Sequence, residues 1–257
     1  MIKTIPFALF VMFISLSGCA KDYSLAPPAD SEQITVTVRI SKDLNARPLE
    51  VIYRSTLCTF TDHSASGKPY QRDDYQRMDI APVRQGQSDL YQAKLSIDGG
   101  GACQWRLSNV TFGVTYADPT RFGENVNYRA GGGVVVLFDH NNAPRGGADF
   151  KAEGDVIIQK DYYPWVDEEF LGPYKKTVSL AGEGKIYLSY RALNARRVHF
   201  EPLFHPGYVV YSAGPKVKRK GNETTFTYPD NSVVADGRTK PDFQKMQALR
   251  LAAESKQ

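Results

Sequence analysis

The residue types that most often carry out catalysis are present in this chain, but without the spacing that catalysis requires. The 257 residues include four histidines, which are scattered along the chain at His63, His140, His199 and His205. The nucleophile motif Gly-x-Ser-x-Gly, the zinc motif His-Glu-x-x-His, the phosphate-binding loop and the dinucleotide fingerprint do not occur. We therefore expect a protein that is not an enzyme and that carries no cofactor.

Metal-binding patterns are also incomplete. The run Asp139-His140-Asn141-Asn142 begins like a calcium loop, but Pro144 and Arg145 stand where the turn glycine should be. Cys58 and Cys103 are distant from each other and have no paired histidines beside them, as a zinc site would need. The sequence therefore predicts no metal centre.

The start of the chain has the pattern of a bacterial lipoprotein signal. A lysine precedes an apolar run that is too short for a membrane-spanning helix. The run ends in Leu16-Ser17-Gly18-Cys19, which matches a lipobox, whereas an ordinary secretory signal with a chance cysteine is the alternative. We expect residues 1–18 to be removed, Cys19 to be acylated and residues 19–32 to form a tether. Because Ala20 and not an aspartate follows, the outer membrane is favoured over the inner one, with the protein facing the periplasm.

Two cysteines remain after the signal, Cys58 and Cys103. In an oxidising periplasm an even pair favours a disulfide, and two unpaired buried thiols are the alternative. The formal charge of +4 is a mild excess that does not indicate a nucleic-acid partner.

Residues 33–117 show the alternation of apolar and polar side chains that is typical of half-buried strands. Residues 61–75 are polar and contain turn-forming residues, so we expect a loop there. The region as a whole predicts an antiparallel β-sandwich within an all-β fold. The clearest expected strands are 34–40, 49–60 and 91–97.

The stretch from Asp98 to Tyr116 is the most distinctive part of the chain. Gly99, Gly100 and Gly101 favour a tight turn or bulge. The apolar positions that follow change parity near Ser108, which predicts a β-bulge or a turn between two short strands. We expect these glycines, with Cys103 and Trp105, to be scaffold and not binding surface.

Residues 118–257 are expected to form a second mainly β region, either a domain or an extension, that ends in one helix. Strand-like segments run through this region, with Gly-rich or Asn-rich turns between them. The helix is expected over residues 241–255, with Thr239 as its cap and Pro241 in its first turn.

Two segments have the composition of recognition surfaces. The first combines aromatic and acidic side chains and would suit a basic partner, although its aromatics would alternatively turn into the core. The second is the basic run 216–220, which would suit anionic lipid or an acidic partner, or would be a solvated turn. The residues of the first segment are Asp161, Tyr162, Tyr163, Trp165, Asp167, Glu168 and Glu169.

One resemblance adds a specific role. The stretch G-G-G-A-C-Q-W-R-L-S-N-V-T-F-G-V at 99–114, R-Q-G-Q-S-D-L-Y-Q-A-K-L-S-I-D at 84–98 and the lipobox at Cys19 resemble lipoproteins that accompany phospholipase effectors of type VI secretion systems. Members of that family act as immunity proteins, and the resemblance covers residues 34–117. It implies a lipid-anchored periplasmic protein that binds a secreted phospholipase toxin and blocks its attack on membrane phospholipids. It implies no catalytic residue.

Two other functions fit the same sequence. An envelope scaffolding or assembly lipoprotein would hold other periplasmic proteins, without any toxin. A small-ligand or glycan-binding sandwich would have a concave pocket, with Tyr162, Tyr163 and Trp165 as its natural walls.

Overall fold

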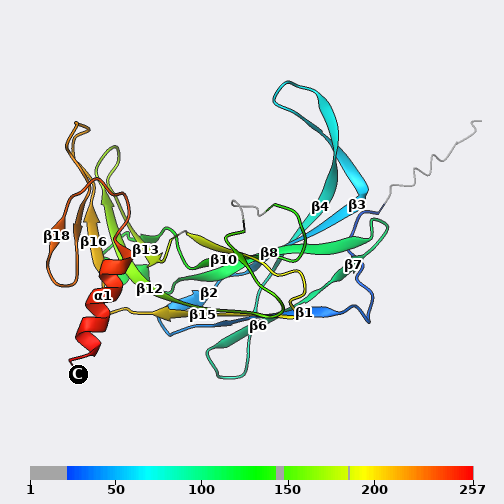
Figure 1. Ribbon diagram of the computed structural model, residues 1–257, viewed down its shortest axis with the longest axis horizontal. Helices are drawn as coiled ribbons and strands as arrows, with labels where there is room; N and C mark the ends of the chain where they lie inside the picture. The colour runs from blue at the N-terminus through cyan, green and yellow to red at the C-terminus, as the bar shows by residue number, and fades with distance from the viewer. Residues whose placement is uncertain (1–21, 143–147, 185, 257) are drawn as a thin grey trace, which may run out of the picture.

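The computed structural model describes residues 22–142, 148–184 and 186–256. Cys19 and the signal before it lie outside the described residues. The described chain is mostly β with one C-terminal α-helix, which confirms the predicted fold class (Figure 1). In chain order the elements are β1 (Gln33–Arg39), β2 (Leu44–Ala46), β3 (Leu49–His63), β4 (Pro69–Ile80), β5 (Val83–Arg84), β6 (Leu90–Ser96), β7 (Asp98–Gly100), β8 (Trp105–Tyr116), η1 (Pro119–Phe122), β9 (Asn127–Tyr128), β10 (Gly133–Leu137), β11 (Phe150–Lys151), β12 (Val156–Glu169), β13 (Lys175–Gly182), β14 (Tyr187–Arg191), β15 (Arg197–Phe204), β16 (Val210–Ala213), β17 (Thr225–Thr227), β18 (Val233–Val234) and α1 (Phe243–Glu254).

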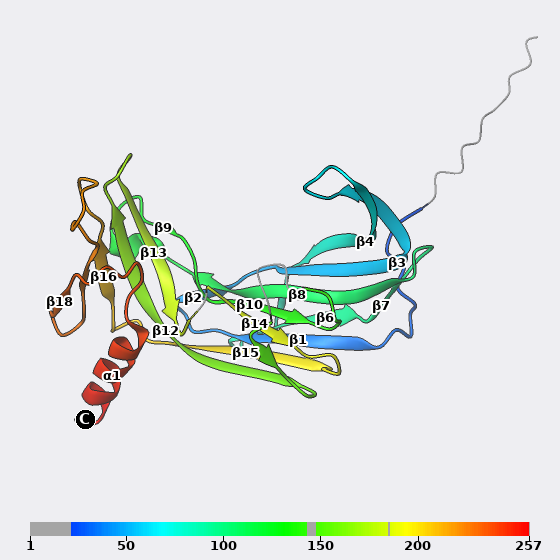
Figure 2. The same cartoon turned by 45° about the horizontal axis from the view of Figure 1, so that its top comes forward.

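Two mixed sheets pack against each other and enclose the main core. The first has the strand order β18-β17-β16-β12-β15-β1-β6-β5, with β13 paired to β12 and β9 paired to β13. The second has the order β11-β14-β10-β8-β3-β4, with β2 and β7 each paired to β8. Figure 2 shows the two layers from a second direction. Phe112 of β8 meets Phe200 of β15 edge to face across the core, with 6.2 Å between the ring centroids.

The two predicted regions, 33–117 and 118–257, share both sheets. The strand pairs within residues 33–117 are antiparallel, as predicted for that region. The parallel pairs of the described chain each include a strand from 118–257, such as β1 with β15, where Val36 lies opposite Val198. The boundary at residue 117 therefore separates segments that fold together around one core.

The predicted change of parity in the Asp98–Tyr116 stretch is a β-bulge. On β3, Ile52 and Tyr53 are adjacent, whereas their partners on β8 are two residues apart. Those partners are Asn109 and Leu107, and Ser108 between them is the extra residue. The bulge moves the apolar positions of β8 from one parity to the other while keeping them in the core.

The prediction of a loop at residues 61–75 is wrong. Residues 69–80 form strand β4, which pairs with β3 in a long hairpin whose turn spans Ser64–Lys68. Most of β4 is exposed on both faces, and its sequence therefore lacks the apolar alternation of a half-buried strand. Alternation of apolar and polar residues indicates a strand only where one face is buried, so it does not indicate β4.

The C-terminal helix forms over Phe243–Glu254, within the predicted range, but its cap is not Thr239. Asp242 is the N-cap, and its carboxylate accepts a hydrogen bond from the backbone N–H of Lys245 at 3.2 Å. Met246 is fully buried and anchors the helix in a second, smaller core cluster that includes Phe226.

The predicted tether is not a free linker where the structure describes it. We call residues 22–32 the strap. The backbone N–H of Ala26 donates to the carbonyl of Gly99 at 2.9 Å, and Ala26 also forms a β-bridge with Gly100. Leu25 packs against the main core. The strap is therefore part of the folded body.

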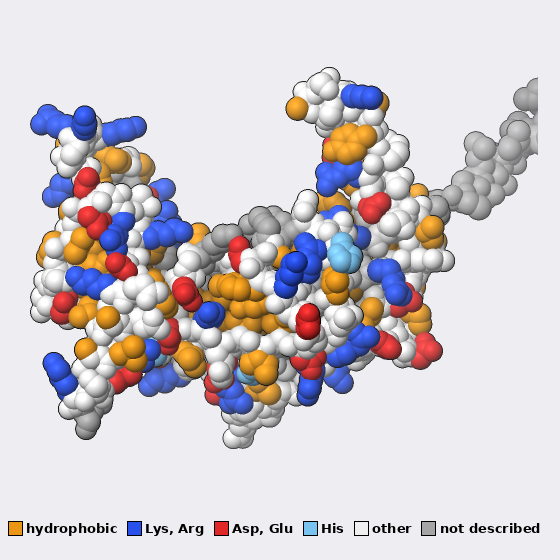
Figure 3. Space-filling model, viewed as in Figure 1, with side chains coloured by type: hydrophobic (Ala, Val, Ile, Leu, Met, Phe, Trp, Pro, Cys, Tyr) orange, Lys and Arg blue, Asp and Glu red, His pale blue; other side chains and the backbone are white. Residues whose placement is uncertain are grey.

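Two projections rise from the same side of the sandwich, one at each end (Figures 1 and 2). One is the outer part of the β3–β4 hairpin, residues 54–75, which we call the arm. The other contains the connections 170–174 and 214–224 that follow β12 and β16. Figure 3 shows that the molecule is hollowed between them.

Candidate partner-binding site

The aromatic residues predicted to form a recognition surface are mostly buried. Tyr162 and Tyr163 are 4% and 0% exposed, so the predicted contact surface is wrong for these two residues. They lie on β12, a strand in the interior of its sheet, where successive side chains point to opposite faces and both faces are covered. Tyr162 packs against Phe200 in the main core, and Tyr163 stacks on His205 in the smaller cluster beneath α1.

Asp161 contacts the residues that dock helix α1. One of its carboxylate oxygens lies 2.6 Å from His205 Nε2, and the other accepts a hydrogen bond from Gln247 at 3.2 Å. Arg250 lies 3.5 Å from the same carboxylate and donates to the hydroxyl of Tyr163 at 3.1 Å. Burial raises the pKa of the Tyr163 phenol. These contacts join α1 to β12 and to His205, which follows β15.

The acidic residues at the end of β12 are paired within the chain. Arg129 Nη1 lies 2.9 Å from Asp167 and 2.6 Å from Glu169. Glu168 lies 3.6 Å from Lys176 Nζ and accepts a hydrogen bond from Tyr174 at 2.8 Å. Because these carboxylates already have partners, the segment does not present the free acidic surface that was predicted for a basic partner.

Trp165 borders an open cavity of about 340 Å³ beside α1. Its indole N–H donates to the hydroxyl of Ser212 at 2.7 Å, and Ser212 donates to Asp167. Tyr162 and Tyr163 do not line this cavity. Of the three residues predicted to line a glycan pocket, only Trp165 therefore lines this cavity. Its lining includes Arg129, Leu180, Ile186, Lys240 and Phe243.

The described residues contain no cluster of three or more His, Cys, Asp or Glu that could hold a metal ion. The calcium-like run is described only as far as Asn142. Within it, Asp139 accepts hydrogen bonds from the backbone and side-chain nitrogens of Asn141, at 2.9 and 2.7 Å. Among the helices of the described chain, none has the length and apolar character needed to cross a membrane.

The arm presents the aromatic and charged surface that β12 lacks. Beyond the Arg54–Tyr75 pair it is a two-stranded ribbon, and β4 is the edge strand of its sheet. Leu57, Tyr70 and Tyr75 are 60%, 45% and 51% exposed. Large apolar side chains gathered on one projecting element are a mark of a contact surface.

Arginines hold the exposed rings of the arm in place. Arg72 lies 5.7 Å from the ring centroid of Phe60 and 2.7 Å from the carboxylate of Asp62. The Arg72 guanidinium beside Asp62 lowers the pKa of that carboxyl. Arg54 lies 5.9 Å from the ring of Tyr75, which in turn meets Phe60 edge to face at 6.5 Å. These contacts order the rings without burying them.

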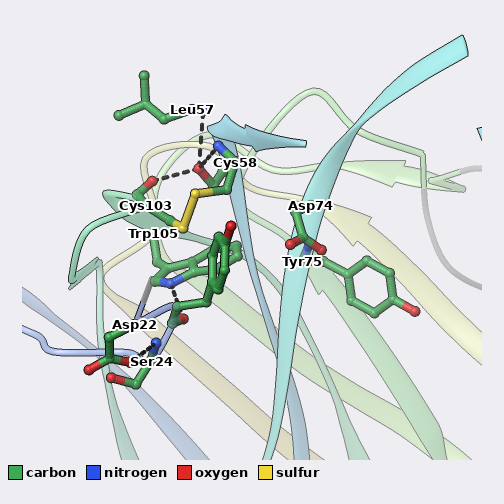
Figure 4. Close-up of a disulfide and its surroundings, with 10 residues drawn as sticks. Asp22, Ser24, Leu57, Cys58, Asp74, Tyr75, Cys103 and Trp105 are labelled. Carbon is green, nitrogen blue, oxygen red and sulfur yellow. Dashed lines mark hydrogen bonds between the residues drawn. A yellow bond between two sulfur atoms is a disulfide. The ribbon is translucent and has the colours of Figure 1, made fainter. Parts of the chain in front are cut away.

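A disulfide clamps the root of the arm to the turn between β7 and β8 (Figure 4). Cys58 and Cys103 are bonded, which confirms the predicted bridge. Beside it the hydroxyl of Ser55 donates to the carbonyl of Cys103 at 2.5 Å and accepts from the backbone N–H groups of Leu57 and Cys58. Tyr75 points away from the disulfide on the other side of β4. Since an isolated hairpin is only marginally stable, these contacts give the arm a fixed base.

The predicted basic run lies in the connection between β16 and β17, on the opposite projection. Residues 216–220 are all exposed, and Lys216 Nζ lies 5.6 Å from the ring of Phe170. Figure 3 shows Lys and Arg side chains at that tip. The run is therefore exposed at the far side of the hollow from the arm, and its contact with anionic lipid or an acidic partner stays a prediction.

The arm was missed in the sequence because its strands are polar on both faces. The turn residues Ser64–Lys68 between two segments rich in Tyr, Thr and Arg are the signal that would have indicated a hairpin. Comparison with family models, with curated proteins and with solved structures finds no match to this chain. The functional proposal therefore depends on the geometry of the arm and on the sequence resemblance of residues 34–117.

Proposed function

We propose that this protein is a lipid-anchored, periplasm-facing inhibitor that binds a secreted phospholipase through its arm. The observation that carries the proposal is the projecting hairpin with exposed Leu57, Tyr70 and Tyr75 on a disulfide-clamped root. Together with the resemblance to immunity lipoproteins, it supports a phospholipase effector of a type VI secretion system as the partner. The inhibitor protects its own cell from that toxin.

The chemistry of the arm suits the substrate entrance of a lipase. Such an entrance must be apolar because it receives acyl chains, and the arm offers apolar and aromatic side chains of matching character. Tyrosine gives a large contact area at low entropic cost. Because the arm is ordered before binding, less conformational entropy is lost on association.

Acylation of Cys19 would place the inhibitor where the toxin acts. A lipase must reach a bilayer to find its substrate, and an inhibitor held at that bilayer has a high effective concentration there. The outer membrane is the favoured location.

The test is inhibition of a type VI secretion phospholipase, measured as phospholipid hydrolysis with and without the full chain. A phospholipase gene beside this protein's gene would identify the enzyme to use. We expect inhibition by the wild-type protein, and at least tenfold weaker inhibition by the double variant Tyr70→Ser, Tyr75→Ser. Tyr211→Ser is the matched control, because Tyr211 is 47% exposed on the other projection. Uninhibited hydrolysis in the presence of the wild-type protein would exclude the proposal.

An envelope scaffolding protein would use the same arm for another periplasmic partner. The enzyme assay separates the two functions: a scaffold binds without changing hydrolysis.

A further inference from the structure

The strap packs against Gly99, Gly100 and Gly101, where a larger residue would collide with its neighbours. A side chain at Gly99 would lie 2.9 Å from the side chain of Leu25, and at Gly100 it would overlap the carbonyl oxygen of Ala26. A side chain at Gly101 would overlap the carbonyl oxygen of Ser24. Gly100 and Gly101 therefore leave room for the strap backbone, and Gly99 leaves room for the Leu25 side chain.

Hydrogen bonds fix both ends of the strap against the glycine turn. At its start, the indole N–H of Trp105 donates to the carbonyl of Tyr23 at 2.9 Å. At its end, the hydroxyl of Ser31 donates to the carbonyl of Asp98 at 3.2 Å, and the Asp98 N–H donates back at 3.1 Å. Trp105 itself is fully buried, so its donor has a fixed position.

The same turn is covalently tied to the arm. Cys103 lies between Gly101 and Trp105, and its disulfide partner Cys58 is in the root of the arm. Figure 4 shows the strap residues Asp22 and Ser24, the Trp105 ring and the disulfide next to one another. In Figures 1 and 2 the strap and the arm share one end of the sandwich, whereas α1 lies at the other.

We infer that the Gly99–Trp105 turn is a clamp that fixes the strap so that a lipid surface is contacted by the arm-bearing end of the sandwich. The inference rests on the proposed acylation of Cys19. An extended chain of the four residues from Cys19 to Tyr23 spans at most about 14 Å. A lipid on Cys19 would keep the clamp within that distance of the bilayer. The arm is then held near the membrane, where a phospholipase acts, and α1 points away from it.

The experiment uses the full lipidated protein in vesicles of phosphatidylethanolamine and phosphatidylglycerol. Chymotrypsin cleavage after Tyr23 or Leu25 releases the body from floating vesicles, and the release rate is measured. We expect Gly100→Ala to raise that rate at least tenfold, because the added methyl group displaces Ala26. Gly86→Ala is the control: its φ of +60° nearly equals the +58° of Gly100, but nothing lies within 4 Å of the added carbon.

A second readout measures the distance to the membrane. In a Trp165→Phe background Trp105 is the only tryptophan, and its energy transfer to a dansyl-labelled headgroup reports on the clamp. We expect transfer to fall at least twofold on Gly100→Ala and to stay constant on Gly86→Ala. If Gly100→Ala fails to form the disulfide, Leu25→Ser with Ala29→Ser as its control perturbs the strap alone. Because Leu25→Ser removes one cleavage site, only cleavage after Tyr23 is then compared.

The outcomes distinguish the clamp from the anchor. Equal cleavage and equal transfer in the clamp variants and their controls would overturn the clamp while leaving the anchored inhibitor intact. Wild-type protein that does not float with vesicles would overturn the lipid anchor and the membrane orientation together. Slow cleavage and strong transfer in the wild-type protein, both lost on releasing the strap, would establish the inference.

Discussion

The arm and strand β12 both carry tyrosines and carboxylates that contact arginines, yet only the arm presents its tyrosines to solvent. β12 has a strand on each side, and both of its faces are covered at Tyr162 and Tyr163, so these tyrosines are buried. Its acids are paired within the chain. The arm extends beyond the point where β3 pairs with β8, so no second layer of the sandwich covers its rings. Composition is therefore insufficient to identify a contact surface. The position of the strand in its sheet decides whether the same side chains form core or surface.

The largest expected difference between the two regions is in stability. Tyr163→Ala should lower the free energy of unfolding by about 3–5 kcal/mol, because it empties a fully buried site beneath α1. Tyr75→Ala should change it by about 0.5 kcal/mol or less, since Tyr75 is exposed. Urea unfolding followed by circular dichroism measures both. Equal losses for the two variants would contradict the assignment of one region to the core and the other to the surface.

The next effect concerns the root of the arm. Cys58→Ser with Cys103→Ser should cost about 2–4 kcal/mol, because the bridge closes a loop between residues 45 positions apart. We also expect faster amide hydrogen exchange in the arm, while β12 keeps its protection. Mass spectrometry of the exchanged protein resolves the two regions. Uniform loss of protection across both would show that the bridge supports the whole sandwich and not the arm in particular.

The same difference between buried strands and the exposed arm explains which parts of the fold could be predicted from the sequence. Strands with one buried face, such as β1, were predicted from alternation, and the bulge at Ser108 followed from a change of parity. The bridge followed from cysteine counting. The parallel pairing of β1 with β15 could not be predicted, because both strands fit several partners by pattern alone. The arm was missed because alternation reports burial and β4 is mostly exposed on both faces; only its turn residues indicate the hairpin.

A smaller effect is expected at the cap of α1, the element that covers β12. Asp242→Ala should cost about 1 kcal/mol by removing the hydrogen bond to Lys245. Hydrogen bonds from Arg238 and from the Lys245 N–H lower the pKa of the Asp242 carboxyl. Its stabilisation is therefore complete above the pKa of the unfolded chain and is lost as the pH falls through the folded pKa. Unfolding curves at neutral pH and at acid pH should show the penalty of the substitution only at neutral pH, and a penalty that persists in acid would contradict this origin.

The smallest effect is expected on the surface of the arm. Arg72→Ala should leave the unfolding midpoint unchanged, because Arg72 and Asp62 form an exposed ion pair, and such pairs contribute little. The substitution should still raise the pKa of Asp62 towards its ordinary value, because the Arg72 hydrogen bond is the main cause of its lowering. Carboxyl NMR titration measures this change, and Arg84→Ala, which removes an exposed arginine hydrogen-bonded to Ser88, is the control. An Asp62 pKa that Arg72→Ala does not alter would mean that Arg72 does not order the arm in solution. The rings of Phe60 and Tyr70 would then reach a partner as a flexible surface, and the entropic advantage argued for the arm would be lost.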